Sequence, residues 1–118
     1  MLPVLPYAAE QTLTLAWDAP ASNADGSPIT DLAGYRIYSA EVPIETRDQA
    51  GLEQLAELPA SSLQADVTVM TTALSGTLYF RATAFDTSGN ESALSNEVAF
   101  PYDFVPPTTI TIRPVSPR

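Results

Sequence analysis

The stretch that decides the fold is LYFRATAFDTSGNESALSNEV, which runs from Leu78 to Val98. Its first half alternates in side-chain character, which predicts a β-strand over Leu78 to Asp86 with one buried face. A polar turn follows, opening on Asp86 and closing with Gly89-Asn90, and a second strand is expected to begin after it. The expected inward set is Leu78, Phe80, Ala82 and Ala84, and the outward set is Tyr79, Arg81, Thr83 and Phe85.

Strands are also predicted over residues 12–17, 35–39 and 66–72, because apolar side chains recur there at every second position. A turn-rich loop, residues 20–31, separates the first two. A last short strand, residues 97–100, is expected to close the domain. The expected inward residues of the three strands are Leu13, Leu15 and Trp17, then Tyr35 and Ile37, then Val67, Val69 and Thr71, whereas Arg36 and Tyr38 should point outward.

Residues 41–62 leave two alternatives open. Thr46 and Gln49 have the spacing of a capping box, and apolar residues follow at helical spacing, which predicts a short helix. The competing prediction is a short strand near Leu55–Leu58.

Composition excludes several classes of function. The chain has 118 residues, which indicates one domain, and it has neither Cys nor His. Without those residues there is no thiolate metal site and no usual general base, so we expect no catalysis, no metal and no cofactor. Up to Phe100 the chain holds thirteen acidic residues and three Arg, a net charge of −10, which argues against nucleic acid. No apolar run is long enough to span a membrane, and residues 1–6 do not resemble a secretory signal.

The loop containing Asn23, Asp25 and Asp31 has some character of a calcium loop. The position that should supply the last acidic ligand falls on Gly34 or Arg36, however, so turn formers without an ion are expected. Asp86, Asn90 and Glu91 receive the same interpretation.

Residues 12–100 resemble the fibronectin type III family, in particular its bacterial and bacteriophage members. The resemblance rests on Leu-Thr-Leu-Ala-Trp ending at Trp17, on Gly-Tyr-Arg-Ile-Tyr ending at Tyr38, and on residues 86–98. It implies an all-β, seven-stranded immunoglobulin-like β-sandwich, and it favours the strand in residues 41–62. The expected organisation is an N-terminal arm or first strand (1–10), the sandwich (11–100), and a Pro-rich C-terminal arm with a short strand (101–118).

Two surfaces are candidates for partner binding. The outward faces of the strands predicted over residues 35–39 and 78–86 should form one surface rich in Tyr and Arg, which are common at contact hot spots. The alternative is that residues 41–58 or the arm cover this surface within the chain. In the arm, residues 108–112 alternate and are expected to add to a sheet edge of a neighbouring copy or of another partner. The alternative is a disordered tail. The candidate residues are Arg36, Tyr38, Tyr79, Arg81, Phe85, Thr108, Ile110 and Ile112.

The family resemblance then implies a function. Isolated domains of this type are similar to accessory or decoration subunits of tailed bacteriophage heads and tails, made in the host cytoplasm and located in the virion. Expected partners are other virion proteins (capsid, tail or connector subunits) and copies of the chain itself, with weak binding of host-surface carbohydrate. The alternative is a spacer or carbohydrate-associated module of an extracellular bacterial enzyme or adhesin.

Overall fold

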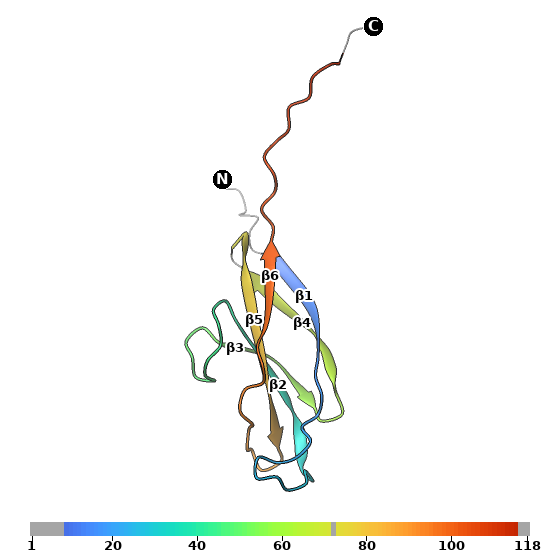
Figure 1. Ribbon diagram of the computed structural model, residues 1–118, viewed down its shortest axis with the longest axis vertical. Coiled ribbons are helices and arrows are strands. Elements are labelled where there is room, and N and C mark those ends of the chain that lie inside the picture. The colour runs from blue at the N-terminus through green and yellow to red at the C-terminus, as the bar shows by residue number, and fades with distance from the viewer. Residues whose placement is uncertain (1–8, 72, 116–118) are drawn as a thin grey trace, which may run out of the picture.

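The computed structural model describes residues 9–71 and 73–115, and these form an all-β structure of two antiparallel sheets (Figure 1). The described residues contain no helix long and apolar enough to cross a membrane. One sheet pairs β1 (Ala9–Ala16) with β4 (Gln64–Thr71). The other has the order β3-β2-β5-β6, formed by β2 (Leu32–Ala40), β3 (Glu53–Pro59), β5 (Ser75–Asp86) and β6 (Val98–Asp103).

The core lies between the two sheets and consists of alternate side chains from both. Burial of such apolar surface is the main force that holds two sheets together. Ile37 on β2, Leu78 and Phe80 on β5, and Val67 and Val69 on β4 are all buried. The inward faces predicted for these strands are therefore confirmed.

Trp17 follows β1 and packs against the edge of this core. Its ring lies 5.4 Å from that of Tyr35, at an interplanar angle of 56°. Leu13, Leu15 and Trp17 all contact the core cluster but are half-buried. Among the described strands, β1 is paired on one side only, which leaves the other flank of these side chains uncovered.

Residues 41–62 contain a strand, so the predicted helix is wrong and the competing strand is confirmed as β3. Gln49 does not cap a helix. Its side-chain oxygen accepts a hydrogen bond from the Glu45 amide at 2.8 Å, and its amide group donates to the Pro43 carbonyl at 2.9 Å. Gly51 then adopts a φ of 81°, a left-handed conformation that ends the turn before β3 begins.

Six strands are present in the described residues, where seven were predicted. The expected first strand falls largely on residues 1–8, which lie outside the described residues, and residues 9 and 10 open β1. The last strand continues to Asp103, beyond the expected boundary at residue 100, because Tyr102 belongs to the buried core. Pro101 is tolerated because β6 is an edge strand. Residues 108–112 are extended but pair with no strand of the described chain.

Candidate interaction surfaces

The outward residues of β2 and β5 share one face of the four-stranded sheet. We call this the outer face, because the two-stranded sheet covers the opposite one. All five predicted contact residues of the sandwich come from these two strands. The register of the pair places Arg36 opposite Thr83, Tyr38 opposite Arg81, Ala40 opposite Tyr79 and Gly34 opposite Phe85.

Glu91, which follows the turn after β5, is the centre of the outer face. Its carboxylate accepts hydrogen bonds from the Thr83 hydroxyl at 2.5 Å and the Tyr38 hydroxyl at 2.6 Å. It also forms ion pairs with Arg47 at 2.7 Å and Arg36 at 2.9 Å. The Glu91 side chain is only 11% exposed. Burial by itself raises the pKa of Glu91, but the two hydroxyls and the two arginines outweigh it and the pKa is lowered.

These five residues, the Glu91 cluster, satisfy much of the outer face within the chain. Arg36 also pairs with Glu57 at 2.9 Å, and its guanidinium lies 4.1 Å from the centroid of the Phe85 ring. The hydrogen bond to Glu57 is the largest cause of the raised pKa of Arg36. Burial, followed by the bond to Glu91, raises the pKa of the Tyr38 hydroxyl. Arg36 and Tyr38, two of the residues predicted to reach a partner, therefore already have polar partners within the chain.

Arg81 fastens the segment before β6 to the same face. Its Nη1 donates to the Ser95 carbonyl at 2.6 Å, and its Nε lies 3.5 Å from the Glu97 carboxylate. Glu97 in turn accepts a hydrogen bond from the Ile44 amide at 2.8 Å, and the Ile44 side chain is fully buried. Residues 41–48 thus cover part of the outer face, as the intramolecular alternative requires, while Tyr79 stays half-buried on it.

The C-terminal arm beyond β6, unlike the outer face, is not covered by the described chain. From Asp103 to Val115 each described residue is exposed, and the chain runs away from the two sheets beyond the end of β6 (Figure 1). Ile110 is 84% exposed and Ile112 is 85% exposed. Thr108, the third arm residue predicted to bind a partner, is exposed as well. The arm offers large aliphatic side chains that nothing in the described chain covers.

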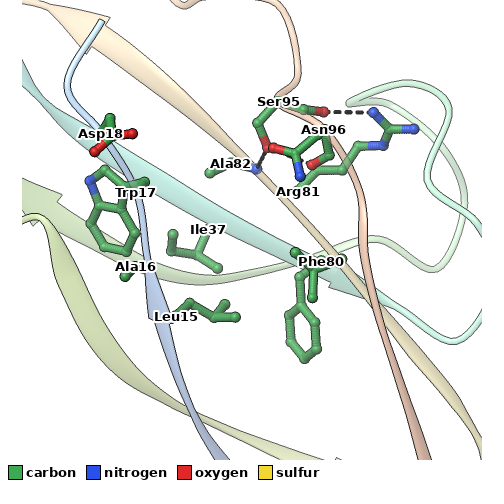
Figure 2. Close-up of a pocket in the computed structure, with 11 residues that line it drawn as sticks. Leu15, Ala16, Trp17, Asp18, Ile37, Phe80, Arg81, Ala82, Ser95 and Asn96 are labelled. Atoms are coloured by element: carbon green, nitrogen blue, oxygen red, sulfur yellow. Dashed lines mark hydrogen bonds between the residues drawn. The ribbon is translucent and has the colours of Figure 1, made fainter.

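A groove of about 420 Å³ lies between the end of β1 and the strands β5 and β6 (Figure 2). We call it the β1–β6 groove. Leu15 and Trp17 line it from one sheet, and Phe80 and Val98 from the other. Ser95 marks its rim, where its Oγ accepts a hydrogen bond from the Ala82 amide at 2.9 Å. The lining is mostly apolar, and nothing in the sequence pattern alone indicated that this site would be left uncovered.

The acidic loops act as turns. The Asp25 carboxylate accepts hydrogen bonds from the amide and the hydroxyl of Ser27, and these lower the pKa of Asp25. The Asp86 carboxylate accepts hydrogen bonds from the Asn90 side chain and from the amides of Ser88 and Asn90, and its pKa is lowered with Asn90 as the main cause. Within residues 9–71 and 73–115, no group of three or more acidic side chains is placed to hold a metal ion. Glu91 was also interpreted as a turn former, but its main role is to bind the other residues of the Glu91 cluster.

Comparisons with known proteins give no match to any family model, any curated protein or any solved structure.

Proposed function

We infer that this chain is a non-enzymatic structural subunit that binds its neighbours mainly through the C-terminal arm. The observation that carries this proposal is the exposure of Ile110 and Ile112 on a segment that leaves the sheets and pairs with no described strand. Isolated aliphatic side chains on a surface are ordinary, but two at alternate positions of an extended segment suit addition to a sheet. The arm therefore supplies the contact and the two sheets supply a rigid body.

The finer assignment is part of the same proposal. The fold is that of a fibronectin type III domain, supported by the motifs around Trp17, Tyr38 and Asp86. The setting is the virion of a tailed bacteriophage, where the chain decorates or joins subunits of the head or tail. The support for this setting is the resemblance to the bacteriophage type, together with an arm that enlarges an interface without enlarging the core.

The Glu91 cluster has a supporting role in this proposal. It ties together the loop containing Arg47, the strand containing Tyr38 and the turn that ends at Glu91. A body whose loops are tied in this way changes little when the arm is engaged. The exposed parts of Arg36 and Arg47 remain available for secondary contacts at the rim.

The test is the mass of the protein in solution, measured by light scattering over a range of concentrations. The full chain is compared with a chain that ends after Val105, which keeps β6 and the buried Tyr102. We expect the full chain to self-associate and the shortened chain to stay monomeric. If both were monomeric at every concentration, arm-dependent assembly would be contradicted and the alternative of a spacer module with a Pro-rich linker would be favoured.

A further inference from the structure

The two sheets differ in width, and this leaves one side of the core uncovered. On one side β3 and β4 are joined by a short connection and contact each other. On the other side, the two-stranded sheet ends at β1, whereas the four-stranded sheet continues through β5 to β6. Val98 shares the inward face of β6 with Phe100 and Tyr102, yet it is 44% exposed. The β1–β6 groove is the space where a further strand beside β1 would lie.

The free edge of β1 has main-chain groups available for such a strand. The Trp17 amide donates to the Leu63 carbonyl on the β4 side at 3.0 Å. Because main-chain groups alternate in direction along a strand, those of Thr12, Thr14 and Ala16 point to the opposite side. No described strand pairs with β1 there. An unpaired edge next to an apolar groove is a template for strand addition.

The arm has the pattern that the groove requires. Ile110 and Ile112 fall on one face of an extended chain, whereas Thr109 and Thr111 fall on the other. Charge agrees as well: residues 1–100 carry −10, and residues 101–118 carry +1, from two Arg and one Asp. Asp18 lies at the rim of the groove, and Arg113 directly follows the alternating segment. The arm therefore suits an acidic acceptor of this kind.

The arm of the same chain is badly placed to occupy the groove. Val98, at the groove, begins β6, and the arm leaves from the other end of that strand and continues away (Figure 1). We propose that residues 108–112 of a second copy add to the free edge of β1 and place Ile110 and Ile112 in the β1–β6 groove. This inference rests on the proposed function, because it names the acceptor of the arm.

Cross-linking of full-length variants tests the proposal. The chain has no cysteine, so single introduced thiols report contacts without background. Thr14→Cys, on the exposed face of β1, is mixed with Thr111→Cys and treated with a short bismaleimide, which tolerates small differences in register. The matched control replaces Thr14→Cys by Glu53→Cys, at an exposed position on the edge strand β3. We expect a cross-linked heterodimer with Thr14→Cys and its loss with Glu53→Cys.

A second pair of variants tests which face of the arm is buried. Ile110→Asp added to the Thr111→Cys chain should abolish the heterodimer, whereas Thr109→Asp should leave it, because Thr109 faces away from the groove. Equal yields with Thr14→Cys and Glu53→Cys, or no heterodimer with either, would overturn the proposal. If light scattering still showed arm-dependent association, the acceptor site alone would be wrong. If that association were absent too, the proposed function would fail with it.

Discussion

The outer face and the β1–β6 groove lie on opposite faces of the same four-stranded sheet. Side chains of the outer face are covered by the chain itself, whereas those of the groove remain partly exposed. On the outer face, Tyr38 and Thr83 are buried under a loop and bonded to Glu91. In the groove, the inward side chain of Val98 is 44% exposed, and the adjacent edge of β1 is unpaired among the described strands. The face that looks like a binding surface in the sequence is satisfied by its own chain, while the inner side of the sheet is not.

The comparison teaches that aromatic and charged content does not by itself mark a contact surface. Arg36, Tyr38 and Arg81 have partners in the chain, so a partner protein would have to compete for them. Among the described residues, the apolar side chains and main-chain groups at the open edge of β1 have no such partners, and strand addition would stabilise them directly.

The largest effect is expected at Trp17, which forms one wall of the groove. Trp17→Ala should lower the free energy of unfolding by about 3 kcal/mol, because it removes a large ring that packs on Tyr35 and the core. Trp17→Phe keeps an aromatic ring there and should cost less. Chemical denaturation measures both variants. An unchanged midpoint for Trp17→Ala would show that this wall does not belong to the core.

On the outer face, Glu91→Ala should cost about 2 kcal/mol, because it leaves two arginines and the hydroxyls of two buried residues without their acceptor. Glu91→Gln is the matched control, since it keeps the size of the side chain and one acceptor oxygen while removing the charge. Its stability should fall between those of the wild type and Glu91→Ala. If both variants were as stable as the wild type, the Glu91 cluster would be a surface feature without structural importance.

The charge of Glu91 should also be visible in the dependence of stability on pH. The pKa of Glu91 is lowered from its ordinary value of 4.5 in the folded state. The ionised carboxylate therefore contributes stability above about pH 4.5, and this contribution is lost as the pH falls through the folded pKa. The stability difference between the wild type and Glu91→Gln should shrink below pH 4.5. A difference that stayed constant down to acid unfolding would contradict the lowered pKa. Asp25 and Asp86 titrate in both proteins, so their effects cancel.

The smallest effect on folding is expected in the arm. Ile110→Asp should change the free energy of unfolding by no more than about 0.5 kcal/mol, because the side chain is 84% exposed in the single chain. The same change should reduce self-association, whereas Thr109→Asp should not. Sedimentation velocity of the two variants at equal concentration measures this. Equal association of Ile110→Asp and the wild type would rule out burial of this face of the arm.

Local patterns sufficed for much of the fold. The alternation around Leu78 and Phe80, and around Val67 and Val69, predicted strands with the correct inward face, because a period of two has only one way to bury its apolar residues. Residues 41–62 were ambiguous because the Thr46–Gln49 spacing suits both a capping box and a closed turn. Only the tertiary position of Gln49, bonded to Glu45 and Pro43, separates them.

The Glu91 cluster and the groove could not be predicted in the same way. The partners of Glu91 come from β2, β5 and the loop after β2, and no spacing along the chain connects them. A usable signal was the outward Arg36 on β2, which needs a counter-charge when a loop covers it. The groove depends on how many strands face β5 and β6, which no single strand encodes.

The most direct test of the central claim is amide hydrogen exchange at Thr12, Thr14 and Ala16, on the free edge of β1. We expect exchange that is fast in dilute protein and slows as concentration rises, and no such slowing in Ile110→Asp, because the arm of another copy would pair with these amides. Exchange that is equally fast at every concentration would contradict the account. Protection that is already complete in dilute protein would contradict it too, since the edge would then be covered within one chain.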